Sequence, residues 1–413
     1  MASPGWGKIW LSRRSLEGLR VGRIVSVGTA VPEHEVDQRE AQEFARGLFR
    51  EAFVDIDRLL TIFDHAAIER RRFSQPRSWF ERDHSFSERN GAYVDAACRL
   101  GEEAIRRCLS GAGLSPQEVD HFIFVSSTGL STPSIDAHLV NRLGMNPHVK
   151  RTPLWGLGCA GGAAGLARAF EVARAFPERR VLLLALELCG LTFRRNDLSK
   201  SNLVATSLFA DGAAAVLVAG EKAGVKTEGP RILDAASMTW PQSLDVMGWE
   251  VVDDGLKVIF SKDIPSIVRR QVRPVVEQFL RRWELTPDRV ERYIAHPGGA
   301  KVLTAYEEAL SLEETALTHA RSVLRTHGNM SSATVLFVLE QEMREKPPAG
   351  TYGLITALGP GFSLELMLIQ WGDPVLTEGM EDLVPAGDRA GTRGSMPPSA
   401  WGPPMESSLP SHI

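Results

Sequence analysis

Cys159 stands in a setting that favours nucleophilic chemistry. It lies within the stretch Trp155-Gly-Leu-Gly-Cys-Ala-Gly-Gly162, between a Gly-rich turn and an alanine-rich run that predicts a helix. At the start of a helix, a thiol faces unpaired backbone N–H groups and the positive end of the helix dipole, and both favour the thiolate. A buried cysteine among glycines can equally be a packing residue, so this motif alone leaves both interpretations open.

Two further residues could assist a thiol nucleophile. His296 follows an apolar stretch and precedes Pro-Gly-Gly, and Asn329 stands between Gly328 and Met-Ser-Ser-Ala at the start of an apolar run. Each has an ordinary alternative, because His296 could be a structural histidine at a strand end and Asn329 a helix cap. Together with Cys159 they form a known nucleophilic constellation, in which an imidazole partners the thiol and donors hold a developing oxyanion. Their joint occurrence predicts carbonyl chemistry at the sulfur.

The elements that must position these residues alternate between strands and helices. Strands are expected at 23–32, 121–126, 151–155, 181–187, 209–219, 232–239, 293–295, 352–358 and 362–371. Helices are expected at 36–49, at 90–109, from Pro133 onward, after Cys159, and at 264–283, 301–310, 315–325 and 332–345. The alternation predicts an α/β fold with buried sheets, and the similar order in both halves predicts a duplicated fold.

Four segments are expected along the chain. Residues 1–20 predict an irregular arm, 21–222 an N-terminal half with the cysteine, and 223–375 a C-terminal half with the histidine and the asparagine. The boundary is placed where the composition becomes charged and Gly-rich, at 220–229. Residues 376–413 are rich in Pro, Gly and Ser, which predicts a disordered tail.

Composition excludes several classes of protein. The 413 residues are 43% hydrophobic and 24% charged, as in ordinary globular proteins, and the net charge of −4 argues against a nucleic-acid binder. No apolar run is long enough to span a bilayer, and no signal peptide is recognised. The four cysteines are too sparse for a disulfide scaffold and show no metal-ligand spacing, so a reducing, cytoplasmic setting is expected.

One short basic run, Ile68-Glu-Arg-Arg-Arg-Phe73, has two interpretations. Such a run is usually a solvated face, but it could also meet a ligand that carries phosphate.

Five motifs carry a family resemblance. They are Gly158-Cys-Ala-Gly-Gly162, Leu208-Phe-Ala-Asp-Gly-Ala-Ala-Ala215, Ile294-Ala-His-Pro-Gly-Gly299, Gly328-Asn-Met-Ser-Ser-Ala333 and Gly359-Pro-Gly-Phe362. Their identity and order resemble type III polyketide synthases, the chalcone and stilbene synthase superfamily, from about Gly22 to Trp371. The resemblance implies a thiolase-like fold whose two similar halves form a layered αβαβα core. It also implies a homodimer, and no metal or cofactor beyond the CoA of the substrates, acyl-CoA and malonyl-CoA.

The resemblance assigns roles to individual residues. Cys159 would take the starter acyl group from CoA, His296 would be its imidazolium partner, and His296 and Asn329 would hold the enolate oxygen formed when malonyl-CoA loses CO2. Phe209 matches a gatekeeper aromatic, and Thr132 falls where a loop reaches into the partner subunit's cavity. The implied substrate-binding set is Phe209, Val258, Thr192, Cys189, Trp249, Thr132, Ser331, Gly359, Pro360 and Gly361.

Departures from the family pattern bear on the substrate. Val258 replaces an aromatic second gatekeeper, which predicts a wider passage. The implied CoA-binding set is Arg58, Lys301, Gly298 and Gly299, while His65 and Thr61 stand where basic residues are expected. The stretch 248–263 is most similar to bacterial alkylpyrone and alkylresorcinol synthases, which implies long-chain fatty acyl starters.

Two alternatives remain at this level. One is a ketoacyl synthase of the fatty-acid initiating type, which would share the Cys-His-Asn set but take malonyl from acyl carrier protein. The other is a catalytically silent subunit of the same fold that binds acyl chains.

Overall fold

The computed structural model describes residues 21–372, so the expectations for 1–20 and 376–413 lie outside the described residues. Its main sheet has nine strands in the order β11-β12-β13-β8-β1-β7-β6-β4-β5. The first half of the chain supplies β1 (Gly22–Ala30), β4 (His121–Val125), β5 (Lys150–Leu154), β6 (Arg180–Leu188) and β7 (Asp211–Gly220). The second half supplies β8 (Arg231–Thr239), β11 (Arg292–Ala295), β12 (Tyr352–Gly359) and β13 (Ser363–Gln370).

The two halves repeat one strand pattern. In the first half, β1 pairs antiparallel with β7, β7 antiparallel with β6, and β6 parallel with β4, which continues to β5. In the second half, β8 pairs antiparallel with β13, β13 antiparallel with β12, and β12 parallel with β11. Only two residue pairs, at the starts of β1 and β8, join the half-sheets. The duplicated fold predicted from the order of elements is therefore present as a repeated topology.

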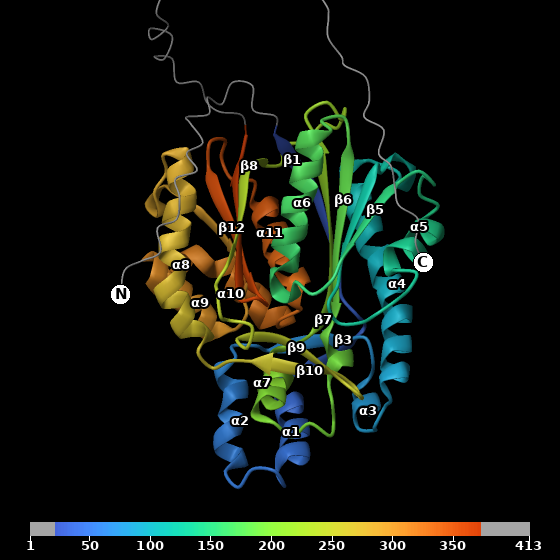
Figure 1. Ribbon diagram of the computed structural model, residues 1–413, viewed down its shortest axis with the longest axis vertical. Coiled ribbons are helices and arrows are strands. Elements are labelled where there is room, and N and C mark those ends of the chain that lie inside the picture. Colours follow the sequence, from blue (N-terminus) through green and yellow to red (C-terminus); the bar gives the residue numbers. More distant parts are fainter. Residues whose placement is uncertain (1–20, 373–413) are drawn as a thin grey trace, which may run out of the picture. The chain divides into compact units, whose positions relative to one another are not determined.

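Helices form three layers around these half-sheets (Figure 1). Helices α6 (Gly161–Ala175) and α11 (Thr334–Glu345) lie between them and contact strands of both halves. The outer layer of the first half contains α4 (Phe86–Ala112) and α5 (Ile135–Leu143), and that of the second contains α8 (Ile264–Leu280), α9 (Ala300–Leu310) and α10 (Thr318–His327). This is the αβαβα arrangement of the thiolase-like fold.

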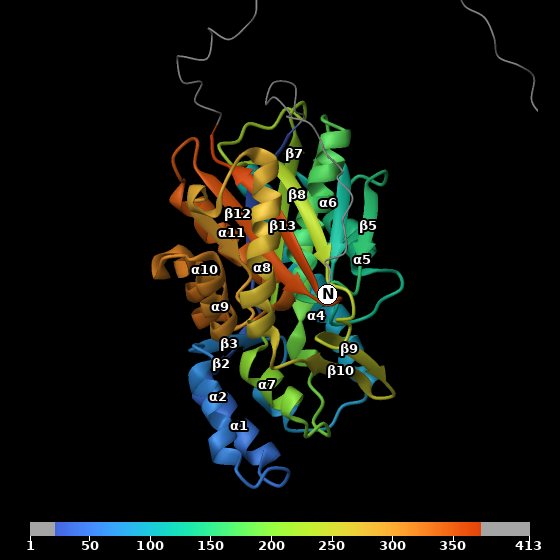
Figure 2. The same ribbon diagram turned by 60° about the vertical axis from the view of Figure 1, so that its left-hand side comes forward.

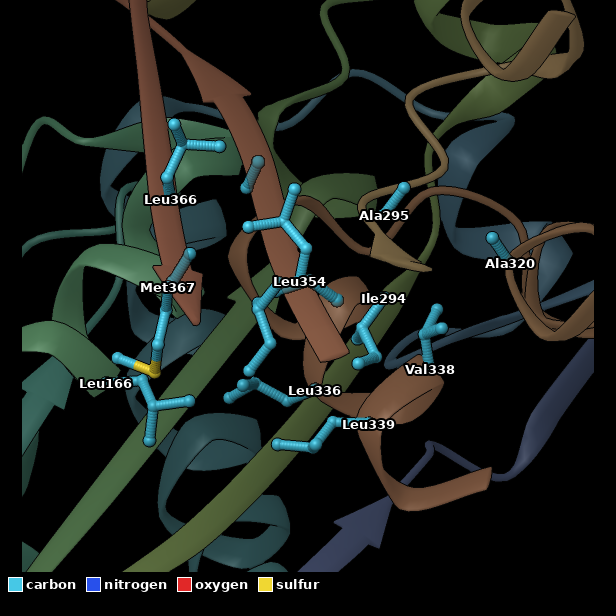
Figure 3. Close-up of a cluster of buried hydrophobic side chains, with 14 of the residues drawn as sticks. Leu166, Ile294, Ala295, Ala320, Leu336, Val338, Leu339, Leu354, Leu366 and Met367 are labelled. Carbon is cyan, nitrogen blue, oxygen red and sulfur yellow. The ribbon is translucent and has the colours of Figure 1, made fainter. Parts of the chain in front are cut away.

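Because helices cover both faces, the central strands carry continuous apolar runs rather than an alternating pattern. All ten residues of β7 are buried. Figure 3 shows one contact of the second half-sheet with the middle layer, where Met367 of β13 lies close to Leu166 of α6. Leu336 of α11, Leu354 of β12 and Leu366 of β13 belong to the same apolar cluster. Each such leucine contributes about 1.5–3 kcal/mol through burial, so the layer that carries the Cys159 turn is held firmly.

A smaller group of elements lies at one end of the layered core (Figure 2). It contains α1 (Gln38–Phe49), α2 (Ile56–His65), α7 (Lys200–Leu208), the strand pair β2 (His34–Asp37) and β3 (Arg70–Phe73), and the hairpin of β9 (Met247–Val252) and β10 (Gly255–Phe260). Its own apolar cluster consists of Val36, Ala41, Ala45, Phe49, Leu60, Phe63 and Leu203.

Several local expectations were wrong. The helix expected from residue 36 begins at Gln38, because Asp37 caps it in a capping box with Glu40 and Val36 belongs to β2. The helix expected to begin at Pro133 begins at Ile135, after a cis Thr132–Pro133 bond. Helices α2 and α7 and the β9–β10 hairpin were not expected, since they are short and stabilised mainly by contacts with one another and with the core.

Among residues 21–372, no helix combines the length and the apolar character needed to cross a membrane.

Candidate active site

Cys159 sits at the start of α6. Gly158–Ala160 form a single 3-10 turn that runs directly into the helix, and Cys159 is 6% exposed. Gly158 has φ +47°, and a Cβ there would lie 2.7 Å from Cδ of Pro360. The turn therefore needs glycine both for its backbone conformation and for the close approach of the 359–361 loop.

Cys159, His296 and Asn329 line one small cavity, with about 300 Å³ of empty space counted out to its open side. They come from the start of α6, the end of β11 and the loop after α10, so only the tertiary fold brings them together. The other lining residues are Met247, Phe260, Ile264, Gly298, Val302 and Leu358. The three residues singled out from the sequence thus share one small, mostly apolar chamber.

The Asn329 side chain is held in a defined orientation. Its Oδ1 accepts the backbone N–H of Ser331 at 2.8 Å, and its Nδ2 donates to the Gly298 carbonyl at 3.2 Å. Because one Nδ2 hydrogen is used there, the second is available to the cavity. The backbone of Asn329 bridges that of Phe209, with N–H to the Leu208 carbonyl at 2.9 Å and C=O from the Ala210 N–H at 2.9 Å. This bridge fixes the amide relative to β7.

The His296 ring lies at the end of β11, where the backbone N–H of His296 donates to the Thr356 carbonyl at 2.8 Å. The residue is 3% exposed, and neither ring nitrogen has a hydrogen-bond partner among residues 21–372. Burial lowers the pKa of His296 to about 3. In this chamber the imidazole is therefore neutral near pH 7.

The structure changes the expectation that Cys159 is a ready thiolate. Burial raises the pKa of its thiol from 9.0 to about 11. A hydrogen bond from Ser331 lowers the pKa, the Glu187 carboxylate raises it, and a hydrogen bond from Asn329 lowers it, but burial is the largest influence. The helix start is thus outweighed by desolvation of the sulfur.

The raised pKa of Cys159 and the lowered pKa of His296 have the same cause. Burial opposes a lone thiolate and a lone imidazolium alike, so neither charge forms by itself near neutral pH. Passing a proton from Cys159 to His296 would create both charges at once and leave the cavity without net charge. This route to a thiolate requires a hydrogen bond between the two side chains, and neither His296 ring nitrogen has a partner among the described residues.

A second, larger pocket lies among α1, α7 and the β9–β10 hairpin. It has about 770 Å³ of empty space, counted out to its open mouth, and its wall is mostly aliphatic and aromatic. Five residues of the expected substrate-binding set line it, namely Cys189, Thr192, Phe209, Trp249 and Val258. Four more phenylalanines extend the wall, namely Phe44, Phe73, Phe80 and Phe193.

Phe209 lines the larger pocket and has ring neighbours in both the pocket and the Cys159 cavity. Its ring centroid lies 6.3 Å from that of Trp249, which lines the pocket, and 6.5 Å from that of Phe260, which lines the cavity. Trp249 pairs with Val258 across the hairpin. Phe209 therefore keeps aromatic neighbours although Val258 has no ring. The wider passage expected from that valine stays a prediction.

Comparison with known families agrees with this geometry. The chain matches chalcone and stilbene synthases, with their N-terminal domain over residues 12–222 and their C-terminal domain over residues 231–371. The chain belongs to the chalcone and stilbene synthase family. It is a type III polyketide synthase, an acyltransferase that performs a decarboxylating condensation of CoA thioesters. This sets aside the ketoacyl synthase and the silent subunit.

Relatives of this synthase include bacterial proteins of similar length. A Bacillus subtilis (strain 168) protein named "Putative chalcone synthase" is 47% identical, covering 84% of this chain and 98% of the relative. A 1,3,6,8-tetrahydroxynaphthalene synthase from Streptomyces peucetius subsp. caesius is 38% identical, covering 84% and 93%. The crystal structure of 1,3,6,8-tetrahydroxynaphthalene synthase from Streptomyces coelicolor A3(2) superposes with a TM-score of 0.80 at 28% identity, covering 85% and 99%.

The expected substrate-binding residues Gly359, Pro360, Gly361 and Ser331 lie around the Cys159 turn. Gly359 packs on the Cys159 turn, since a Cβ on it would lie 2.5 Å from the Ala160 Cβ and 2.6 Å from the Leu157 carbonyl oxygen. Ser331 has φ +47°, and its side chain lowers the pKa of the Cys159 thiol. Pro360 and Gly361 complete the loop that closes over this turn.

Most of the remaining expected residues lie outside the Cys159 cavity. Thr132 is exposed and lines neither the Cys159 cavity nor the larger pocket. Of the expected CoA-binding set, Gly298 lines the cavity and Gly299 precedes α9, whereas Arg58 on α2 and Lys301 on α9 are exposed. The CoA contacts stay a prediction.

Glu187 is a residue of the site that sequence reasoning missed. It is fully buried at the end of β6, and its carboxylate accepts from the Ser332 hydroxyl at 2.6 Å, the Ser127 N–H at 2.9 Å and the Thr128 hydroxyl at 2.9 Å. Burial raises the pKa of Glu187 to about 7, against these hydrogen bonds. The sequence did contain a signal, an acidic residue within an apolar run. Sequence reasoning took this residue as the end of a strand rather than as a buried carboxylate.

One His/Glu cluster lies away from this site, among the residues that the structure describes. His319 Nε2 is 2.9 Å from Glu345 Oε1 and 3.9 Å from Glu342 Oε1. The Arg292 guanidinium already pairs with both carboxylates, at 2.8 and 3.6 Å. The positive charge beside these two carboxylates is therefore already supplied by the Arg292 side chain.

Proposed function

We propose that this synthase loads a long-chain fatty acyl group from its CoA thioester onto Cys159, extends it with malonyl-CoA, and releases an alkylpyrone or alkylresorcinol. The observation that carries the proposal is the mostly apolar lining of the pocket beside Phe209, which has about 770 Å³ of empty space counted out to its open mouth. An alkyl chain has no polar group to satisfy, so a wall of aromatic and aliphatic side chains favours it over a polar starter.

The loading step uses the Cys159 chamber. The thiol proton passes to a His296 ring nitrogen, and the sulfur attacks the thioester carbonyl of the starter. The tetrahedral intermediate then breaks its bond to the CoA sulfur, which leaves as the thiol with the proton from His296. The acyl group remains on Cys159, and its alkyl chain extends past Phe209 into the apolar pocket.

The extension step uses Asn329. Malonyl-CoA loses CO2, and the electron pair of the broken C–C bond becomes an enolate whose oxygen accepts hydrogen bonds from Asn329 Nδ2 and a His296 ring N–H. The enolate carbon attacks the acyl carbonyl on Cys159, the C–S bond breaks, and the sulfur leaves as the thiolate, which regains its proton from water when the site next opens. The chain, two carbons longer, is then carried by CoA.

Two variants test these roles. Cys159→Ala should abolish acyl loading, which intact-protein mass spectrometry detects as the missing acyl adduct. Asn329→Ala should keep loading but slow malonyl-CoA decarboxylation by about 10²–10³-fold, as for removal of one oxyanion donor. Normal product formation by either variant would contradict the assignment.

Product analysis tests the substrate class. The synthase is incubated with malonyl-CoA and a ladder of saturated acyl-CoA starters, and the products are identified by mass spectrometry. Cyclised products that carry long alkyl chains are expected. The 38% identity to a tetrahydroxynaphthalene synthase favours a second candidate, an aromatic product without an alkyl chain. Only malonyl-derived products across the whole ladder would establish that second candidate instead.

A homodimer completes the proposal. The exposed Thr132 lies on a loop with Leu130, which is 45% exposed, and Trp155 elsewhere on the surface is 51% exposed. Apolar side chains of this size are commonly covered at interfaces. Sedimentation velocity should give a dimer, and a concentration-independent monomer would refute it.

No metal or cofactor beyond CoA is proposed for turnover. Activity should therefore survive dialysis against EDTA. Arg58→Ala and Lys301→Ala should raise the KM for malonyl-CoA if these residues contact its phosphates, with kcat unchanged.

A further inference from the structure

Neighbouring arginines of the basic run 68–73 point to opposite faces of strand β3. In β3, Arg72 faces outward and forms an ion pair with Glu35, its cross-strand partner, whereas Arg71 is only 1% exposed. The outward arginines fit the ordinary interpretation of a solvated face. Arg71 does not, and it is the largest of the fully buried side chains among the described residues.

The guanidinium of Arg71 is tied to the end of α7. Its Nη1 donates to the Thr206 carbonyl at 2.7 Å and to the Phe209 carbonyl at 2.8 Å. The Thr206 carbonyl lies in the last turn of α7, and the Phe209 carbonyl follows that turn. Carbonyl groups at the C-terminus of a helix have no hydrogen-bond partner within the helix and form the negative end of its dipole. Burial lowers the pKa of Arg71 to about 10, so the group is charged near neutral pH. It therefore fixes the backbone that carries the gate ring.

The stem of Arg71 also supports the turn before Asn329. Gly328 has φ +72°, and a Cβ on it would lie 2.7 Å from Cγ and 2.8 Å from Cδ of Arg71. Asn329 follows at once and bridges Phe209 through two backbone hydrogen bonds on either side of it. Arg71 thus contacts both segments of the Phe209–Asn329 bridge. It hydrogen-bonds the Phe209 segment and packs against the turn before Asn329.

We propose that Arg71 is a positioning residue that holds the Phe209 gate and the Asn329 amide as one unit beside the Cys159 chamber. The inference rests on the oxyanion role proposed for Asn329. Cys159 lies just before α6 and His296 just after β11, and the Arg71 hydrogen bonds, which go to Thr206 and Phe209, reach neither of them. Loss of the clamp should therefore disturb the step that depends on Asn329 more than the step that depends on the thiol.

The test separates the two half-reactions. Arg71→Met removes the charge and the donors but keeps an unbranched apolar stem, whereas Arg71→Lys keeps a charged donor. Arg72→Met is the matched control, with the same loss of charge on the same strand. Acyl loading is measured by intact-protein mass spectrometry, and decarboxylation by release of labelled CO2 from malonyl-CoA, both per correctly folded active site and well below the melting temperature.

Arg71→Met should slow decarboxylation by about 10–100-fold, the scale of a misplacement near 1 Å. Because Arg71 also lines the apolar pocket, loading is compared with acetyl-CoA, a starter too short to enter that pocket, and should stay within about threefold of wild type. Arg71→Lys should recover most of the rate, and Arg72→Met should match wild type. Equal losses in both half-reactions, or no loss, would overturn the proposal by leaving Arg71 a purely structural role. If Arg71→Met does not fold, Arg71→Gln, which removes the charge but keeps a polar side chain, decides, and a selective loss of decarboxylation is expected there too. Failure of wild type to decarboxylate malonyl-CoA would instead refute the proposed function.

Discussion

At the scale of single residues, burial dominates the chemistry of the site. Cys159, His296, Asn329 and Glu187 are each 6% exposed or less. In such a chamber an isolated charge is costly, and a hydrogen bond is worth more than in water. Reactivity therefore depends on proton transfer between neighbours and on fixed donors such as the Asn329 amide.

The pH dependence of Cys159 alkylation follows from its raised pKa. In the free synthase the thiol is protonated near neutral pH, and the thiolate fraction grows about tenfold per unit as the pH rises toward the pKa of about 11. Iodoacetamide modification of Cys159, followed by peptide mass spectrometry, should therefore accelerate steadily between about pH 7 and pH 10. A rate that is flat from about pH 6 upward would show instead that a thiolate–imidazolium pair is already formed.

Glu187 adds a second pH effect. Its pKa of about 7 is raised above the ordinary 4.5, so its neutral form is favoured in the folded chain. The stability it contributes is complete below about pH 4.5 and is lost as the pH rises through about 7. Its charge also raises the pKa of Cys159.

Glu187→Gln should move the alkylation profile of Cys159 to lower pH, by roughly half a unit to one unit, because a carboxylate is removed from beside the sulfur. Glu171→Gln on the surface of α6 is the control and should leave the profile in place. An unchanged profile in Glu187→Gln would mean that Glu187 does not act on the thiol.

At the scale of elements, close approaches of backbone set the site. A Cβ on Gly162 would lie 2.1 Å from the Ser332 carbonyl oxygen, so glycine is what lets α6 approach the turn before α11. The same applies to Gly359 against Leu157. These contacts join the cysteine turn to the loops that carry Asn329 and Pro360.

The β9–β10 hairpin is fastened by its turn. Arg194 Nη2 donates to Asp254 Oδ1 at 2.6 Å, Asn196 donates to Asp254 Oδ2 at 2.9 Å, and Arg89 bonds the Asp254 carbonyl. Arg89 also donates to the Phe193 carbonyl at 2.8 Å. The hairpin with Trp249 and Val258 is thus held against the segment that carries Phe193, which gives the apolar pocket a fixed wall.

Phe193 should therefore influence the length of the starter. Its ring lies 5.7 Å from that of Phe44 and 6.3 Å from that of Phe80, inside the pocket wall. Phe193→Ala should shift the preferred acyl-CoA toward longer chains and Phe193→Trp toward shorter ones, by at least about threefold in relative kcat/KM. Phe176→Ala, at an exposed position on the far end of α6, is the control. An unchanged preference would place the chain elsewhere.

At the scale of the whole described molecule, the two halves depend on one another. Helices α6 and α11 pack against both half-sheets, and one apolar cluster runs from Ile24 in β1 to Ile369 in β13. Direct strand pairing between the halves is limited to two residue pairs. Shared burial, rather than the continuous sheet, is what joins them.

A fragment of residues 21–222 should therefore not fold alone. It would expose the face of α6 that packs on β12, β13 and β8, and such a surface is a strong aggregation hazard. We expect loss of cooperative thermal unfolding and binding of a hydrophobic dye, whereas residues 21–372 together should unfold in a cooperative transition. A fragment with a sharp transition and no dye binding would contradict this dependence.

The sequence by itself determined the alternation of strands and helices and the motifs around Cys159, His296 and Asn329. These are local properties, because an apolar run of strand length or a glycine turn is specified by neighbouring residues. The recurrence of the same succession of elements also predicted a duplicated fold, although not the order of the strands in the sheet.

Only the tertiary structure decided the rest. Arg71 and Arg72 are identical neighbours in sequence, yet one lies under the Asn329 turn and the other pairs with Glu35. The pKa of Cys159 depends on how completely distant segments exclude water, and Trp249 reaches Phe209 only through its pairing with Val258. Desolvation and contact between remote segments are properties of packing, which no local pattern records.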